Sequence, residues 1–349
     1  MRGEYRAPGG QLVVVDLEVA GGLLAHVQVS GGFAVAPAQA LPRLTTALEG
    51  MDAKASVAEL TAAMDAVRES GDELLGATTQ GVAIAVRRAL GQALSWEDID
   101  FEVIHGPVLD PVVNVALDET LVEEVAAGRR KPFMRLWEWE GCQVVIGSFQ
   151  SYANELQAEG VTRHGVTVTR RVSGGGAMFM ESGKCVTFSL VVPTALVEGM
   201  SFEQSYPYLD QWVMEVLESL GVKARYVPLN DIASDRGKIA GAAQKRWANG
   251  HMLHHVTMAY DIDPVKMNEV LRIGMAPLRD KGTRSAAKRV DPLRSQIGLS
   301  REQVVQAFHD HFVKKYGASV STLTESELEV ARERSRTKFA TDEWTFRLP

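Results

Sequence analysis

Apolar and polar residues alternate along two stretches near the start of the chain. In residues 12–19 valine and leucine recur at every second position, and the same period returns over residues 25–29, after Gly21 and Gly22. Alternation of period two is typical of half-buried strands, and a glycine pair between two such runs is typical of a turn. The pattern therefore predicts a β-hairpin.

Helical spacing follows the hairpin. Residues 42–48 have a helical pattern, and Ser56 and Glu59 form a capping-box signature ahead of an apolar face that continues to Val67. A third helix is predicted over residues 78–90. Together the hairpin and the helices predict a small α+β unit of ordinary domain size.

The rest of the chain mixes strand and helix patterns without a regular βαβ order. Helical spacing predicts helices over residues 112–126 and 202–220, and Ser300 has the sequence context of a helix cap. Strands are predicted over four runs, residues 133–139, 142–146, 166–170 and 186–192. Because strands and helices do not alternate, we expect an α+β fold with mixed or antiparallel sheets, not a doubly wound parallel sheet.

These patterns also predict the domain organisation. We expect a small α+β domain over residues 1–95, a linker over 96–110, and a second, larger domain over 111–349.

Composition excludes several classes of protein. The 349 residues are 46% hydrophobic and 23% charged, close to globular averages. The net charge of -7 gives no long-range attraction for nucleic acid or anionic lipid. The sequence contains no signal-peptide pattern and no apolar run of about 18 residues that could span a bilayer. The only two cysteines, Cys142 and Cys185, favour a reducing compartment. We therefore expect a cytoplasmic protein without nucleic-acid or membrane partners.

The first segment with candidate chemistry is a glycine-rich loop. Three consecutive glycines, Gly174, Gly175 and Gly176, follow a predicted strand and two adjacent arginines. Such a loop can bring backbone N–H groups close to anionic oxygens, although a glycine triplet can also be a plain turn. It lacks the G-x-G-x-x-G spacing of a dinucleotide-binding loop, and the chain runs on toward another strand.

The second segment surrounds a lysine. Lys238 lies among small residues, Gly237, Ala240 and Gly241, shortly after Asp231. A lysine in such surroundings can approach a phosphate or carboxylate closely and act as a point charge. Taken alone, a lysine beside a glycine is more often a solvated loop residue.

The two segments in this order resemble lipoate-protein ligases of the lipoate/biotin ligase superfamily. The similarity extends over most of the chain, from residues 114–119 through 144–150, the loop 170–177, the motif 237–244 and the histidine pair 254–255 to 343–346. Residues 1–95 resemble the accessory domain of these ligases, which familiar members carry last. The resemblance implies a biotin/lipoate-ligase type of catalytic domain with the accessory domain fused at its N-terminus.

The resemblance implies a two-step reaction. ATP, with Mg²⁺, activates lipoate to lipoyl-AMP, and a lysine of a lipoyl carrier domain then takes the acyl group. The carrier would be the E2 component of a 2-oxoacid dehydrogenase or the H protein of glycine cleavage. A basic stretch, Arg284, Lys288 and Arg289, suits either a solvated face or contact with an acidic carrier.

Site residues are carried over by position. Lys238 matches the catalytic lysine of the family. The expected ATP-binding residues are Arg171, Gly175, Gly176, Ala177, Met178, Phe179 and Lys238, and the expected lipoate-binding residues are Arg171, Ser173, Gly174, Lys238 and His255. Asp231 either holds Mg²⁺ or caps its own loop. Residues 180–184 depart from the usual polar segment, so their ligand contacts stay open.

Three other functions are alternatives to a lipoate ligase. An octanoyltransferase of the same superfamily would need a nucleophilic thiol near the lysine motif, and residues 230–237 contain no cysteine. A biotin ligase is disfavoured because its usual glycine-arginine-rich loop is absent. A non-catalytic lipoate-binding protein would have no need to retain both Arg171 and Lys238.

Overall fold

A computed structural model describes residues 1–6, 10–91, 93–273 and 289–348. The chain divides into two compact units. Unit 1 comprises Met1–Ile99 and Thr194–Tyr208, and unit 2 comprises Asp100–Pro193 and Leu209–Pro349.

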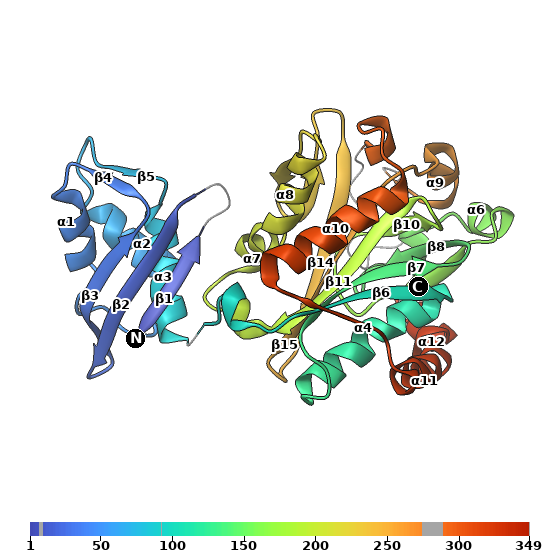
Figure 1. The fold of residues 1–349 in the computed structure, drawn as a ribbon, viewed down its shortest axis with the longest axis horizontal. Coiled ribbons are helices and arrows are strands. Elements are labelled where there is room, and N and C mark those ends of the chain that lie inside the picture. Colours follow the sequence, from blue (N-terminus) through green and yellow to red (C-terminus); the bar gives the residue numbers. More distant parts are fainter. Residues whose placement is uncertain (7–9, 92, 274–288, 349) are drawn as a thin grey trace. The chain divides into compact units, whose positions relative to one another are not determined.

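Unit 1 contains the predicted hairpin and helices. Its three-stranded antiparallel sheet has the order β1-β2-β3, and a two-stranded ribbon pairs β4 with β5. The strands are β1 (Arg2–Arg6), β2 (Leu12–Ala20), β3 (Leu23–Gly31), β4 (Ala34–Ala36) and β5 (Glu73–Leu75), and the helices are α1 (Ala40–Thr46), α2 (Val57–Ala66) and α3 (Thr79–Leu90). Helix α3 packs on β1 and β2, beside α2, as the blue part of Figure 1 shows. The capping box at Ser56 is formed in both directions.

A segment from the middle of the chain completes unit 1. The buried guanidinium of Arg88 donates hydrogen bonds to the carbonyls of Glu4, Leu94 and Leu196, the last at 2.7 Å. The ring of Tyr208 stacks on Tyr5 with centroids 6.2 Å apart. Residues 194–208 therefore belong to the core of this unit, which the sequence pattern did not indicate.

Unit 2 is built on a mixed sheet of eight strands and a smaller one of three. The orders are β12-β13-β14-β15-β11-β7-β6-β16 and β10-β8-β9. The large sheet contains β6 (Glu102–Leu109), β7 (Phe133–Trp139), β11 (Cys185–Pro193), β12 (Arg225–Val227), β13 (Asp231–Ala233), β14 (Lys238–Arg246), β15 (His251–Ala259) and β16 (Ser319–Ser321). The small sheet contains β8 (Cys142–Ile146), β9 (Thr167–Arg170) and β10 (Met178–Glu181). Among the described strands, β6 with β7, β6 with β16, and β8 with β9 run parallel and the other pairs antiparallel, which confirms the expected α+β class with mixed sheets.

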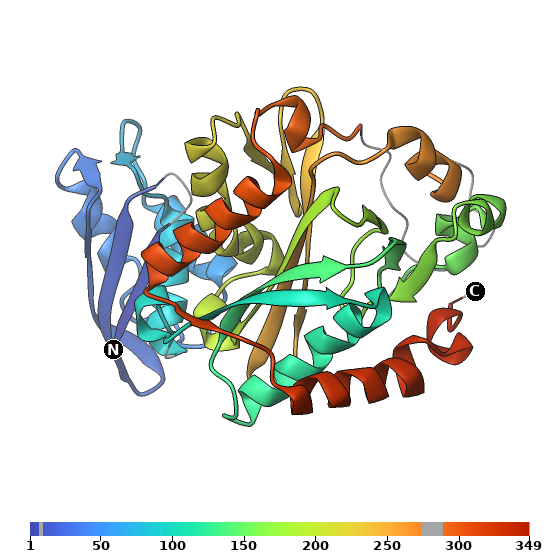
Figure 2. The same ribbon diagram turned by 45° about the vertical axis from the view of Figure 1, so that its right-hand side comes forward.

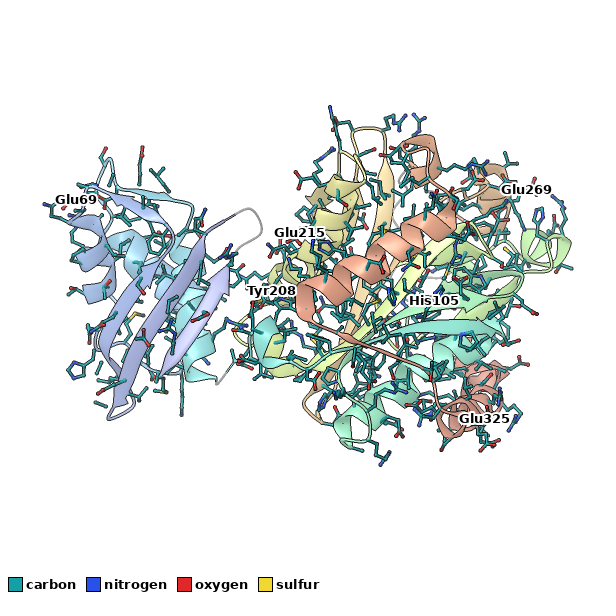
Figure 3. The ribbon with its side chains drawn as sticks, viewed as in Figure 1. Glu69, His105, Tyr208, Glu215, Glu269 and Glu325 are labelled. Carbon is teal, nitrogen blue, oxygen red and sulfur yellow. The ribbon has the colours of Figure 1, made fainter. Side chains whose placement is uncertain are left out.

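Helices pack around the two sheets of unit 2. They are α4 (Pro111–Ala126), α5 (Tyr152–Glu155), α6 (Ala158–Arg163), α8 (Gln211–Ser219), α9 (Pro264–Val270), α10 (Arg301–Tyr316), α11 (Glu325–Arg334) and α12 (Asp342–Thr345), with α7 (Phe202–Leu209) at the boundary of the units. In Figure 1 the orange-red α10 lies across the strands, and Figures 1 and 2 both show α4 beside α11. The carboxylate of Glu215 on α8, labelled in Figure 3, is hydrogen-bonded to Nε2 of His311 on α10 at 3.0 Å.

Two boundaries differ from the sequence prediction. The predicted linker, residues 96–110, contains β6, an inner strand of the large sheet, because its backbone groups pair with β7 on one side and β16 on the other. The predicted helix over 202–220 is two helices separated at Asp210, whose buried carboxylate is hydrogen-bonded to His254. Among the residues that the structure describes, no helix is both long and apolar enough to cross a membrane.

Candidate active site

One face of the large sheet contains two of the candidate residues, Lys238 and His255. Strands β14, β15 and β11 lie side by side and antiparallel, and directly opposite residues share a face. The register therefore gives two neighbouring rows on this face: Gly241, Thr257 and Thr187 in the first, and Ala243, His255 and Ser189 in the second. Helix α4 covers this face, since its Asp118 accepts a hydrogen bond from Ser189 at 2.6 Å.

Lys238 lies over the first row. Its ammonium is 2.9 Å from a carboxylate oxygen of Asp231, which is opposite Gly241 on β13. A Cβ added to Gly241 would come within 2.7 Å of this ammonium, so the glycine provides the space in which the lysine rests. The Lys238 side chain is 26% exposed, against 6% for Asp231. The lysine is thus an accessible cation held by a buried carboxylate.

The glycine loop, residues 173–177, approaches the second row. A Cβ at Gly175, where φ is +89°, would lie 3.7 Å from the side chain of Ala243. A Cβ at Gly147 would lie 2.1 Å from the carbonyl oxygen of Gly175, so Gly147 permits the loop to pack closely on the small sheet.

Arg171 holds this loop from within. Its guanidinium donates to the carbonyls of Val145 at 2.9 Å, Gly174 at 2.5 Å and Gly176 at 2.9 Å. In a trans peptide the C=O and the following N–H point in opposite directions, so the N–H of Gly175 points away from Arg171. In the described part of the chain the N–H groups of the three glycines donate no hydrogen bond. They are available to an anion, whereas the expected direct contact of Arg171 with a ligand remains a prediction.

His255 links the loop to α4. Its Nε2 lies 2.7 Å from the Ser173 hydroxyl, and its Nδ1 lies 2.8 Å from a carboxylate oxygen of Asp118. Burial lowers the pKa of His255, and the neighbouring Asp118 carboxylate offsets part of this effect. The imidazole is therefore neutral near pH 7, with Nδ1 donating to Asp118.

Sequence reasoning missed the residues that support this histidine. The Asp118 carboxylate also accepts a hydrogen bond from the Arg135 guanidinium at 3.1 Å, and Arg135 donates a second one to the side chain of Asn114 at 2.7 Å. Burial lowers the pKa of the Arg135 guanidinium, which Asp118 partly restores. Asn114 and Asp118 are one helical turn apart in an otherwise apolar segment, and two polar residues on one face of such a helix were the available signal.

The adjacent histidine faces the other side of the sheet, as strand alternation requires. His254 is fully buried, and its Nε2 lies 2.6 Å from Asp210 at the N-terminus of α8. Its side chain points to the face of the sheet opposite that of His255, so His254 is not part of the site.

The remaining candidates lie on or near the small sheet. Met178 is half-buried opposite Val145, and Phe179 is 2% exposed within the core. In the segment 180–184, Glu181 forms an ion pair with Lys266 at 3.1 Å. Of the basic stretch, Arg284 and Lys288 lie outside the described residues, while the Arg289 carbonyl accepts the backbone N–H of Lys238 at 2.7 Å.

Both cysteines are core residues. Cys185 is fully buried, and burial raises its pKa to about 12. Cys142 is 9% exposed and burial likewise raises its pKa. A thiol reacts as its thiolate, so neither side chain is prepared to act as a nucleophile at neutral pH.

The sequence and the fold match those of known proteins. Residues 110–313 match the family described as lipoyl protein ligase A/B catalytic domain. Because the match covers more than half of the 349 residues, the chain belongs to this family. The matched range is almost entirely in unit 2, so the identity of unit 1 as an accessory domain stays a prediction.

Individual relatives point to two reactions. The chain is 28% identical to octanoyltransferase LipM of Lysinibacillus sphaericus over 68% of its own length and 95% of that protein. It is 27% identical to a probable lipoate-protein ligase A of Mycoplasma pneumoniae, covering 70% of each chain. A bipartite lipoate protein ligase of Thermoplasma acidophilum, studied with its E2 lipoyl domain, matches the fold with a TM-score of 0.60 and 25% identity, over 72% of this chain and 98% of that one. The reaction of this chain must therefore be argued from its own residues.

Proposed function

We propose that this protein is an ATP-dependent lipoate-protein ligase, which activates lipoate to lipoyl-AMP and transfers the lipoyl group to a lysine of a lipoyl carrier domain. The observation that carries the proposal is the burial of both cysteines. Transfer through a thioester needs an accessible thiolate, and the two thiols of the chain, Cys142 and Cys185, are buried with raised pKa values. Adenylate chemistry needs no such group.

Lys238 supplies what adenylate formation needs. In the first step a carboxylate oxygen of lipoate attacks the α-phosphorus of ATP, the bond to the β-phosphate oxygen breaks, and pyrophosphate leaves with the electron pair. The two reacting groups are both anionic, so a cation between them lowers their repulsion. The Lys238 ammonium, held over Gly241 and partly exposed, is suited to this position.

The glycine loop is the proposed phosphate-binding element. The N–H groups of Gly174, Gly175 and Gly176 have no described acceptor, and a run of such groups is a ready site for anionic oxygens. Arg171 fixes the carbonyl side of the loop. Met178 and Phe179 would place the nucleotide through the backbone of β10.

Mg²⁺ fits the site only together with the nucleotide. Among the described residues no group of three or more His, Cys, Asp or Glu side chains could hold a metal ion. Asp231 is one carboxylate, engaged by Lys238 at 2.9 Å. Mg²⁺ is commonly bound by one or two carboxylates and substrate phosphates, so Asp231 would hold it with the phosphates of ATP, where its charge would neutralise the leaving pyrophosphate.

In the second step the carrier amine attacks the carbonyl carbon of lipoyl-AMP. A C–N bond forms, and the C–O bond to the phosphate breaks with its electron pair remaining on AMP. The proposed partner is a lipoyl domain of an E2 component or the H protein, and the E2 lipoyl domain associated with the Thermoplasma ligase supports the first.

The test is lipoate-dependent isotope exchange between pyrophosphate and ATP. The parent protein should catalyse exchange, and Lys238→Ala should lose it by about 10²–10³-fold, as removal of an electrostatic stabiliser does. Lys223→Ala, a substitution of an exposed lysine in the same unit, serves as the matched control. Absence of exchange in the parent, with acyl transfer from an octanoyl carrier protein, would instead assign an octanoyltransferase.

A further inference from the structure

Three side chains from separate elements form a continuous hydrogen-bonded series at the site. Asp118 of α4 accepts from His255 of β15 at 2.8 Å, and His255 lies 2.7 Å from the hydroxyl of Ser173 in the glycine loop. Ser173 also accepts from the Nε of Arg171 at 3.0 Å. Because an ionised carboxylate is only an acceptor, Nδ1 carries the imidazole proton and Nε2 must accept that of Ser173. This is the connectivity of a general base acting through a hydroxyl.

The charges around His255 suit a proton acceptor. Burial lowers the pKa of His255, Arg171 beside the glycine loop and His254 on the same strand lower it further, and Asp118 of α4 raises it in part. Arg135 from β7 balances the charge of Asp118 at 3.1 Å. The imidazole is thus unprotonated at neutral pH, and once protonated it would be stabilised by the adjacent carboxylate.

The series lies close to the proposed reaction centre. Lys238 rests over Gly241, and His255 is opposite Ala243, the next residue of β14 on the same face. Alternate residues of a strand are about 7 Å apart. Lys238 and His255 therefore lie over neighbouring rows of the same face of the sheet.

We propose that Asp118, His255 and Ser173 form a proton relay that accepts the proton of the attacking carrier amine in the transfer step. This inference rests on the proposed ligase function. As the C–N bond forms, a proton leaves the amine nitrogen for the Ser173 oxygen, and the hydroxyl proton of Ser173 passes to Nε2 of His255. The C–O bond to AMP then breaks with its electron pair on the phosphate. The imidazolium, paired with Asp118, later releases the proton to water. Asp118 is the positioning residue of this relay.

The experiment separates the two steps with the full-length protein. Transfer is measured in single turnovers from supplied lipoyl-AMP to a carrier domain, and activation is measured by pyrophosphate–ATP exchange at saturating lipoate. Ser173→Ala and His255→Gln should each lower the ratio of the transfer rate to the exchange rate by about 10²-fold, as loss of a general base does. The matched control His254→Gln changes the adjacent, Asp-paired histidine on the opposite face and should leave the ratio unchanged.

The pH profile gives an independent readout. Transfer by the parent should depend on one basic group with a pKa below the ordinary histidine value, and His255→Gln should lose this dependence. If His255→Gln fails to fold, Ser173→Ala, which removes one hydroxyl, carries the test.

Several outcomes would overturn the relay while leaving the ligase function standing. An equal decrease of the transfer and exchange rates would mean that the three side chains only hold the glycine loop in place. Unchanged rates would mean that they take no part in the mechanism. An acyl ester on Ser173, detected by mass spectrometry of the intact protein, would make the serine a nucleophile. Failure of exchange in the parent would count against the proposed function itself.

Discussion

His254 and His255 are neighbours in the chain, and each is paired with an aspartate, yet they occupy different surroundings. His254 and Asp210 are both fully buried on the α8 side of the large sheet. His255 faces α4, where its side chain is 11% exposed and bonded to the loop residue Ser173. Pairing with an aspartate therefore does not by itself identify a catalytic histidine, because His254 in the core has such a partner as well as His255 at the candidate site.

What distinguishes the two pairs is the set of groups around each aspartate. Both aspartates accept a hydrogen bond from a hydroxyl, Asp118 from Ser189 and Asp210 from Tyr226. Asp118 differs in having a second ionic partner, the fully buried Arg135. Its charge is balanced without protonation of the histidine. A neutral, oriented histidine beside a mobile substrate is useful to chemistry, whereas a histidine enclosed on all sides contributes to packing and hydrogen bonding alone.

The largest expected effect concerns Arg135. Arg135→Met leaves Asp118 buried without its ionic partner and should lower the free energy of unfolding by about 3–5 kcal/mol. Urea denaturation measures the change. The double variant Arg135→Met with Asp118→Leu removes both charges and should recover much of the loss. Parent-like stability of the single variant would show that Asp118 does not depend on Arg135.

Substituting each histidine should separate stability from activity. His254→Gln should lower the free energy of unfolding by about 1–3 kcal/mol, because it disturbs a fully buried hydrogen bond, and should spare the transfer step. His255→Gln should lower the transfer rate strongly and the free energy of unfolding less than His254→Gln does. Denaturation and single-turnover transfer, measured on both variants, would refute the distinction if the two behaved alike.

A smaller effect is expected from pH. The pKa of His255 is lowered in the folded protein, so the unfolded chain takes up a proton at a higher pH than the native one. The contribution to stability is complete above about pH 6.5, the ordinary histidine value, and is lost as the pH falls toward the folded pKa. Unfolding free energies between pH 8 and pH 5, compared with those of His255→Gln, measure it. A parent that gained stability on acidification relative to the variant would contradict the assignment.

The smallest effect should come from the thiols. Because burial raises the pKa of both cysteines, to about 12 for Cys185, the native protein should react slowly with a thiol reagent at pH 8. The fully buried Cys185 should react after Cys142. Rapid modification of either thiol, accompanied by loss of activity, would place a nucleophile where the structure has a core residue.

The sequence was sufficient for elements whose pattern is local. The hairpin of β2 and β3, the capping box at Ser56, and strands β7 and β8 were predicted with nearly their observed bounds. The sequence indicated a linker at β6 because Gly106 and Pro107 interrupt the strand, and both residue types are typical of turns and loops. Residues 194–208 belong to unit 1, where Arg88 donates a hydrogen bond to the carbonyl of Leu196. Because the acceptors of Arg88 are backbone carbonyls, which every residue has, the sequence does not indicate these contacts.

The candidate site was predictable in part for the same reason. Lys238 and the glycine loop carry local signals, small residues beside a cation and three adjacent glycines. Asp118 and Arg135 do not, since their importance comes from register and helix packing that unite α4, β7 and β15. Long-range pairing of this kind is decided by the tertiary fold.

The proposed function requires that acyl transfer proceeds through an adenylate and not through a cysteine thioester. The most direct measurement is mass spectrometry of the intact protein during turnover, on the parent and on a variant carrying Cys142→Ala and Cys185→Ala. Both proteins should lipoylate a carrier domain when given ATP and lipoate, without a covalent acyl adduct on the enzyme. An acyl adduct that forms from an octanoyl carrier protein without ATP, and that disappears together with activity in the cysteine-free variant, would contradict the proposed function.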